Sequence, residues 1–254
     1  MKKNRLKIFA MVAALSLPFM GVAQDEPCIK LEGSSDFMSR YVWRGTDFGA
    51  SPSIQPSLKA TMGNLTVGTW GAFAVNNFTQ FQETDLYITY TLKEKLDITF
   101  TDYYFPDETP GAVNNYFEYN DTLTGHVFEG SLKWLGTEKL PLTLLVATNF
   151  YGADARHNDG SLFYSTYIEL GYSGTSGDTE YELFAGFTPN KPTDADKLAG
   201  IDRSFYGNTM GFVNLGVKLN REIKITDHFS LPVSTSFMVN PMAENVFLVF
   251  GFSL

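Results

Sequence analysis

The chain has 254 residues, of which 15% are aromatic and 19% are charged, with 28 acidic side chains against 19 basic ones. This acidity argues against a nucleic-acid-binding role, which requires a basic face. The single cysteine excludes an intramolecular disulfide and a cysteine-based metal cluster.

The first 23 residues predict a secretory signal peptide. Four basic residues among the first seven precede an apolar run from Ile8 to Phe19, and small residues follow at Gly21 and Ala23. The run is shorter than the ~20 apolar residues that a membrane-spanning helix needs. We expect cleavage after Ala23 or one residue later, which leaves residues 24–254 as one domain with 15 basic side chains against 28 acidic ones.

From residue 29 onward the chain alternates apolar and polar residues, as in 54–62, where Ile54, Leu58 and Met62 share one face. A mean hydropathy of −0.10 fits a membrane barrel, because lipid-facing and lumen-facing residues cancel. We therefore predict an all-β fold, a transmembrane antiparallel up-and-down β-barrel of about 12 strands. The twelve segments are 29–44, 54–62, 65–75, 83–92, 96–104, 128–134, 142–150, 164–172, 180–187, 213–225, 229–237 and 246–254.

The connections between these segments alternate between short and long. Short turns on one side and long loops on the other indicate a barrel of the outer membrane, with the long loops outside the cell. The short turns are at 63–64, 93–95, 136–140, 173–178 and 226–228, and the long loops include 106–120, 152–161 and 188–206.

A soluble β-sandwich or closed barrel would alternate in the same way. Two features favour lipid on the outside. Aromatic side chains gather near the strand ends on the apolar face, as interfacial belts do. The chain also finishes on Phe250, Phe252 and an apolar Leu254, which resembles the C-terminal signal that barrel-assembly machinery recognises.

The segment 39–45, SRYVWRG, carries two arginines among aromatic residues. On a single strand, Tyr41 and Trp43 face lipid, whereas Arg40 and Arg44 face the lumen. An arginine at mid-depth on the lipid side would cost ~2–4 kcal/mol, so this register is strongly favoured. The arginines then either form ion pairs with lumen acids such as Asp36 and Glu83 or contact a solute, and Gly45 permits a tight turn. In the segment 213–225, Val213 falls on the same lipid face.

The alternation of residues between the lipid side and the lumen side of each strand assigns nine acids and seven bases to the lumen. This near balance predicts a lumen narrowed by a mixed ionic network, with low conductance and a mild preference for cations. The pore-lining candidates are Lys30, Glu32, Asp36, Arg40, Arg44, Lys59, Glu83, Asp85, Asp97, Glu129, Lys133, Glu169, Glu180, Glu182, Lys218 and Lys224.

No motif indicates an enzyme, a cofactor or a metal site. His126 falls on the lipid-facing parity at a strand edge, and no serine or cysteine accompanies the three histidines in a catalytic pattern. Loop acids at 194, 196 and 202 lack the full ligand pattern of a Ca²⁺ loop, so a solvated acidic loop is the simpler interpretation.

Six segments from about Phe37 to Leu254 carry a family resemblance: SRYVWRGTDFGASPSIQPSL, GNLTVGTWGAFA, ETDLYITYT, TDYYFP, FSLPVSTSFMVNP and VFLVFGFSL. Together they resemble the TorF-type family of outer-membrane porins. The resemblance implies a β-barrel of the Gram-negative outer membrane and a transport role, and it supplies no catalytic residues.

Two functions follow from these patterns. The first is a passive channel for small hydrophilic solutes. The second is a non-conducting barrel whose outer loops bind a partner or surface. Strand number does not choose between them, because twelve strands lie between the filled eight-stranded barrel and the open sixteen-stranded one.

Overall fold

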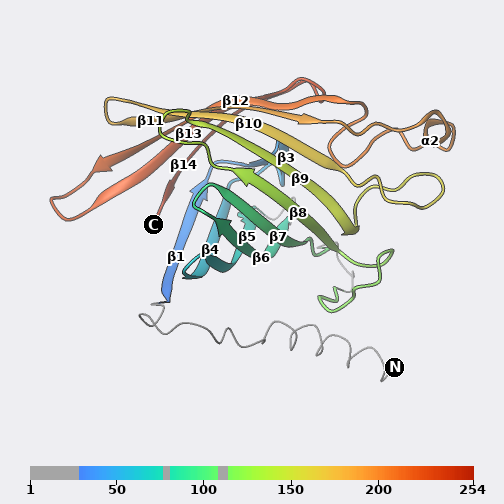
Figure 1. Ribbon diagram of the computed structural model, residues 1–254, viewed down its shortest axis with the longest axis horizontal. Helices are drawn as coiled ribbons and strands as arrows, with labels where there is room; N and C mark the ends of the chain where they lie inside the picture. The colour runs from blue at the N-terminus through green and yellow to red at the C-terminus, as the bar shows by residue number, and fades with distance from the viewer. Residues whose placement is uncertain (1–28, 77–80, 108–113) are drawn as a thin grey trace.

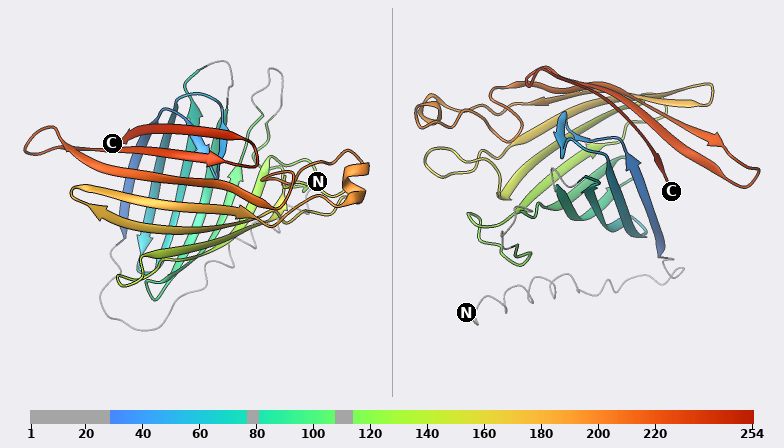
Figure 2. Two further views of the ribbon diagram at one scale, coloured as in Figure 1. Left: turned by 90° about the horizontal axis from the view of Figure 1, so that it is seen from above. Right: turned by 180° about the vertical axis from the view of Figure 1, so that it is seen from behind.

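The computed structural model describes residues 29–76, 81–107 and 114–254, and the predicted signal peptide lies outside these residues. Within them, twelve antiparallel strands close into one barrel in which β1 meets β14 (Figures 1 and 2). The predicted all-β fold, an antiparallel up-and-down barrel of twelve strands, is therefore confirmed. The barrel strands are β1 (Lys30–Met38), β4 (Ser53–Met62), β5 (Leu65–Ala74), β6 (Gln82–Leu92), β7 (Leu96–Tyr104), β8 (His126–Trp134), β9 (Leu142–Gly152), β10 (Thr166–Ser176), β11 (Thr179–Thr188), β12 (Gly211–Lys224), β13 (Ser230–Asn240) and β14 (Asn245–Ser253).

The alternating pattern separates the two faces of the wall. Leu58, Phe100 and Phe250 point outward and are 56–63% exposed, whereas Ala72 and Ala147 at inward positions are fully buried. Because successive side chains of a strand point to opposite faces, each barrel strand presents an apolar outer surface and a mainly polar inner one.

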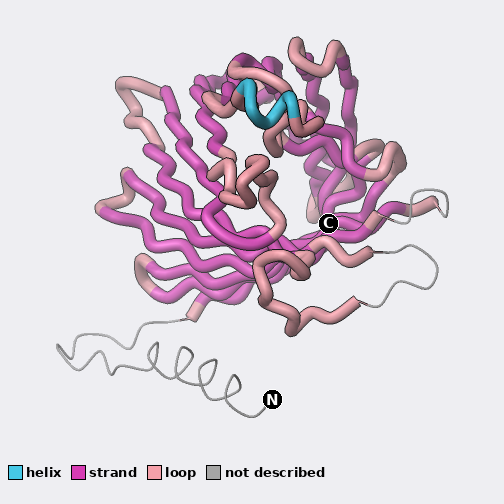
Figure 3. The backbone as a smooth tube through the Cα atoms, turned by 90° about the vertical axis from the view of Figure 1, so that its right-hand side faces the viewer, coloured by secondary structure: helices cyan, strands magenta, loops and turns pink. Residues whose placement is uncertain are grey.

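Short turns join the strands at one end of the barrel, and most of the connections at the other end are longer, although the short turn 241–244 joins β13 to β14 there. One of these long segments carries the short helix α2 (Asp194–Leu198), between β11 and β12. Figure 3 looks into this end of the barrel, where loop segments lie across the opening. In the part of the chain that the structure describes, no helix is long and apolar enough to cross a membrane.

The prediction of one strand over residues 29–44 is wrong. β1 ends at Met38, and the chain then enters the lumen as a hairpin of β2 (Tyr41–Trp43) and β3 (Thr46–Phe48) (Figure 2). Arg44 and Gly45 form its two-residue turn, and both have positive φ, at 48° and 78°. A sixteen-residue strand would also exceed the 9–11 residues that a tilted membrane strand needs.

The outward placement of Val213 is wrong as well. The register between β11 and β12 shifts after Gly186, so that Phe187 pairs with Phe212 and one extra residue follows in β12. This bulge turns Phe212 outward, where it is 51% exposed, and buries Val213 at 1% exposure. A single extra residue reverses the facing of its neighbours, because the side-chain period of a strand is two.

Candidate functional site: the occupied lumen

The β2–β3 hairpin is held in the lumen by aromatic packing. The ring of Tyr41 lies 5.2 Å from that of Trp70 on β5 and 5.4 Å from that of Phe48 on β3. The ring of Trp43 lies 5.4 Å from that of Tyr103 on β7. Tyr41 and Trp43 therefore face inward, and their predicted contact with lipid is wrong.

Arg44 fixes the turn of the hairpin against the opposite wall. Its guanidinium pairs with both carboxylate oxygens of Glu129 on β8, with Nη2 3.0 Å from Oε1, and donates to the hydroxyl of Tyr206 at 2.5 Å. It also lies over the rings of Trp43 and Tyr167, at 4.3 and 4.7 Å from their centroids. The side chains of Arg44 and Glu129 are only 9% and 2% exposed. A bidentate pair in such surroundings orients the hairpin as well as neutralising both charges.

Arg40 closes the base of the hairpin. Its guanidinium lies 2.5 Å from a carboxylate oxygen of Asp47 on β3, and its side chain is 43% exposed. The sequence allows two interpretations for both arginines, ion pairs with acids such as Asp36 and Glu83 or contact with a solute. The structure has ion pairs at both arginines, but the acids are Asp47 and Glu129.

Glu83 and Asp85 occupy successive inward positions of β6, beneath Tyr41, and are 1% and 4% exposed. Within the described chain, no salt bridge joins either acid to a lysine or arginine, and one oxygen of each lacks a hydrogen-bond partner. Their burial shows how tightly the hairpin fills this level of the lumen.

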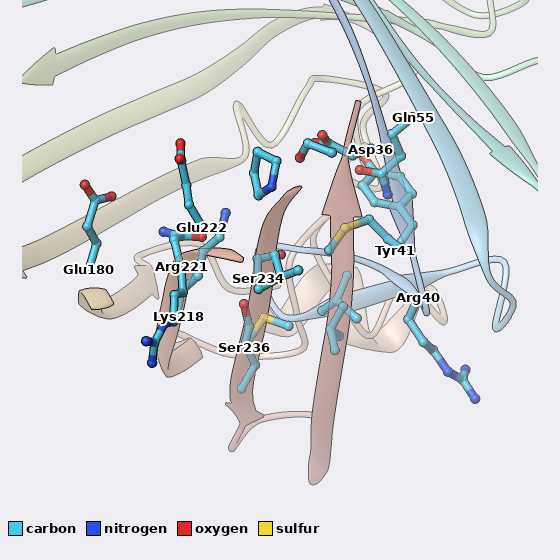
Figure 4. Close-up of a pocket in the computed structure, with 18 of the residues that line it drawn as sticks. Asp36, Arg40, Tyr41, Gln55, Glu180, Lys218, Arg221, Glu222, Ser234 and Ser236 are labelled. Atoms are coloured by element: carbon cyan, nitrogen blue, oxygen red, sulfur yellow. The ribbon is translucent and has the colours of Figure 1, made fainter. Parts of the chain in front are cut away.

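A cavity of about 800 Å³ lies on the short-turn side of the hairpin (Figure 4). Glu180, Lys218 and Arg221 come from one side in this view, and Asp36 of β1 and Tyr41 of the hairpin come from the other. Both signs of charge therefore line the space. A mixed lining of this kind suits small polar or zwitterionic molecules better than a strongly charged ion.

A second cavity of about 520 Å³ lies on the long-loop side of the same hairpin. Its lining includes Thr46 and Asp47 of the hairpin, Arg203 of a long loop, and Asn240 and Asn245 of the wall. Polar space thus lies on both sides of the hairpin.

The other predicted pore-lining residues are distributed over the wall below the hairpin. Glu32 lies 3.0 Å from Lys30 and 3.5 Å from Lys59 at the short-turn end. Asp97 accepts a 2.7 Å hydrogen bond from Thr91 and is paired in register with Lys133. These contacts form small groups rather than one continuous network.

The remaining candidates lie on β10 to β12. Glu182 is in register with Lys218, and Glu169 accepts hydrogen bonds from Tyr167 and, at 3.3 Å, from the side chain of Asn214. Lys224 differs, because it lies at the end of β12 and pairs at 2.6 Å with Asp227 of the following turn.

Sequence reasoning missed the groups that complete the hairpin site. Tyr206 belongs to the predicted outer loop 188–206, but it folds inward and is 5% exposed. The alternating pattern places Tyr167 and Tyr103 on the lumen face but gives them no role, and in the structure Tyr103 donates to Glu129 at 3.1 Å. The alternation of residues along a strand shows which side of the wall each residue faces. It does not show that a loop returns into the lumen.

His126 is on the outer side of the wall, as its parity predicts, but it does not meet lipid. It is fully buried, with Nδ1 2.6 Å from Asp102 Oδ1 and Nε2 2.8 Å from the backbone oxygen of Tyr116. The rings of Tyr104 and Tyr119 also pack on it, at 4.6 and 4.9 Å. The segment before β8 therefore covers a polar pair that includes Asp102, an acid at an otherwise apolar position.

The loop acid Asp196 has a structural role. It is fully buried, and its carboxylate lies 2.7 Å from Nδ1 of His157. It also accepts a hydrogen bond from the backbone N–H of Thr193, the N-cap of α2, and so completes a capping box. Burial raises the pKa of its carboxyl, but hydrogen bonds from Asn158, His157 and Thr193 outweigh burial and hold that pKa well below its usual range. Among the described residues, no group of three or more His, Cys, Asp or Glu side chains is arranged to hold a metal.

A family model described as a bacterial protein of unknown function (Gcw_chp) matches residues 25–137. The match spans β1 to β8, and it includes the hairpin, Glu83, Asp85 and Glu129. A search of curated proteins finds no match. The resemblance to TorF-type porins stays a prediction.

Proposed function

We propose that the protein is an outer-membrane channel that passes small hydrophilic solutes through a lumen constricted by the β2–β3 hairpin. The observation that carries this proposal is the pair of polar cavities, of about 800 and 520 Å³, on the two sides of the hairpin. A molecule that moves along the barrel axis meets polar groups in both spaces, and the hairpin with the inward-folded Tyr206 lies between them.

The setting of the channel belongs to the same proposal. The outward apolar face suits the lipid of the outer membrane, and the short turns suit the periplasmic side. The alternating aromatics of β14 would present the C-terminal strand to barrel-assembly machinery. The mature protein should then fractionate with outer membranes and migrate differently on electrophoresis before and after boiling, because a closed barrel has no free edge from which to unfold.

A second function is favoured by one specific observation. The hairpin is anchored by the buried Arg44–Glu129 pair, which would keep a non-conducting barrel closed while its outer loops bind a partner.

Liposome swelling separates the two functions. Vesicles that contain the mature protein should swell in isotonic glycine or glycerol, and more slowly in a disaccharide. Vesicles that swell no faster than protein-free ones, with protein that keeps its heat-modifiable fold, would support the closed barrel and contradict the channel.

A further inference from the structure

Two acidic side chains lie side by side beneath the β2–β3 hairpin, at successive inward positions of β6. Glu83 and Asp85 are 1% and 4% exposed, and one oxygen of each, Glu83 Oε2 and Asp85 Oδ1, is buried without a hydrogen-bond partner. The Glu83 carboxyl lies within hydrogen-bonding reach of the Asp85 carboxyl. A hydrogen bond between two carboxyl groups requires a proton on one of them, because an ionised carboxylate only accepts hydrogen bonds.

The hairpin closes over these acids with an aromatic ring. In the strand register, Asp85 lies between Trp70 on β5 and Tyr103 on β7. The ring of Tyr41 packs 5.2 Å from that of Trp70 and lines the lumen cavity of about 800 Å³, whereas the two acids do not line it. Tyr41 therefore separates the acids from the polar space of the lumen.

The surrounding groups supply no counter-charge to the two acids. The two arginines of the hairpin are already paired, with Asp47 and Glu129. β5 carries no titratable side chain, and β7 contributes Tyr103 on the inside and Asp102, which is paired with His126, on the outside. Two ionised carboxylates in such a site repel each other strongly, and acids in this arrangement retain a proton between them.

We propose that Glu83 and Asp85 form a proton-binding site that controls the docking of the hairpin. With one proton shared between them, the two carboxyls carry a single negative charge and the hairpin packs over them. When this proton leaves past Tyr41 to the lumen cavity, two adjacent carboxylates remain. Their repulsion and their need for water then displace the hairpin.

The direction of the pH dependence follows from this proton count. The docked state binds one proton more than the displaced state, so docking is favoured at low pH and is lost as the pH rises. Because the hairpin is the proposed constriction, the conductance should rise with pH as well. Only this last step rests on the proposed channel function, since docking itself is measurable without conduction.

Quenching of tryptophan fluorescence by acrylamide follows the docking directly. The chain has three tryptophans, and Trp134→Phe leaves Trp43 on the hairpin and Trp70 beneath it. Acrylamide is uncharged and therefore reaches both pH states of the site equally. The quenching constant of the folded mature protein in detergent micelles should rise roughly twofold or more between about pH 6 and about pH 9. This range stays below the value of about 10 at which tyrosines ordinarily ionise.

The variants remove one charge and keep the shape of the side chain. Asp85→Asn and Glu83→Gln, each with Trp134→Phe, should both give a low quenching constant that is independent of pH, because the remaining carboxylate meets no second charge. Asp97→Asn is the matched control, because Asp97 faces the lumen from β7 and accepts its hydrogen bond from Thr91, away from the hairpin. It should keep the pH dependence of the parent protein. Heat-modifiable mobility verifies that each protein is folded.

A quenching constant of the parent protein that does not change over this range would overturn the proton site. A pH dependence that persists in Asp85→Asn or Glu83→Gln would also overturn it, because other groups would then be titrating. Single-channel recording on the same preparations separates the two proposals. Conductance steps and quenching that both ignore pH would remove the proton site and keep the channel. Quenching that rises with pH in a protein that is silent at every pH would keep the proton site and contradict the channel.

Discussion

Arg44 and Glu129 are 85 residues apart in the chain, and they form a buried, bidentate ion pair between the tip of an internal hairpin and strand β8. The pair connects the first segment after β1 to the far wall of the barrel. Together with the aromatic packing of Tyr41 and Trp43, it therefore anchors the hairpin in the lumen, and the proposed function depends on that anchoring.

Removing Arg44 should loosen the hairpin and destabilise the barrel. Arg44→Ala leaves Glu129 buried without a counter-charge, which typically costs about 3–5 kcal/mol. We expect a lower free energy of unfolding in guanidinium titrations, together with a higher conductance. The control is Arg40→Ala, because Arg40 is half-exposed and its pair with Asp47 should contribute less than about 1 kcal/mol. Equal losses in the two variants would contradict the anchoring role of Arg44.

Gly45 should be irreplaceable, whereas Gly63 should not be. Both have positive φ, but a Cβ at Gly45 would lie 1.9 Å from the backbone oxygen of Val213, and a Cβ at Gly63 would meet nothing within 4 Å. Gly45→Ala should therefore displace the hairpin from β12 and expose it to added protease. Gly63→Ala should cost only the strain of its turn. Proteolysis of the folded proteins checks this, and equal resistance of both variants would contradict the packing of the turn.

Assembly should be sensitive to charge on the outer face of β14. Phe252→Asp removes the stacking with Phe37 where β14 meets β1 and puts a carboxylate on the apolar surface, so we expect little heat-modifiable protein in the membrane fraction. Ser236→Asp is the control, because Ser236 faces inward and is in register with Lys218. If Phe252→Asp assembles as well as Ser236→Asp, the outer face of β14 does not meet lipid.

The α2 segment should detach only in strong acid. A carboxyl whose pKa is lowered by folding stabilises the fold above its unfolded pKa of about 3.9, and this stabilisation is lost as the pH falls below that value. Because the pKa of Asp196 is well below its usual range, hydrogen exchange of residues 189–200 should stay slow at pH 5 and accelerate in strong acid.

The Asp196→Asn variant should show fast exchange of this segment even at pH 7. Asp194→Asn is the control, because Asp194 is exposed in the first turn of the same helix. Exchange that is as fast in Asp194→Asn as in Asp196→Asn would show that the buried carboxylate does not hold the segment.

The sequence predicts the barrel well because each wall strand has one apolar face. The prediction fails where the alternating pattern continues into a segment that is not part of the barrel wall. Tyr41 and Trp43 alternate with Arg40 and Arg44 as in a barrel strand, but the turn at Arg44 and Gly45 folds this segment inward. The length of the 29–44 segment was the available signal, since it exceeds what a membrane strand needs.

Other errors have local causes that parity does not reveal. The bulge at Gly186 reverses the facing of Val213, and a covering segment hides His126 beside Asp102. The ion-pair partners of Arg40 and Arg44 depend on where the folded hairpin places the two guanidinium groups. No local pattern in the sequence specifies the pairing of Arg44 with Glu129, which is 85 residues away.

Single-channel recording in planar bilayers tests the central claim most directly. The mature protein should give small conductance steps, and a variant in which Tyr41–Phe48 is replaced by a short Gly-Ser linker should give steps several times larger. Heat-modifiable mobility verifies that both proteins are folded. Equal conductance of the two proteins would contradict the hairpin as the constriction, and a silent wild type beside a conducting variant would contradict the channel and identify a closed barrel.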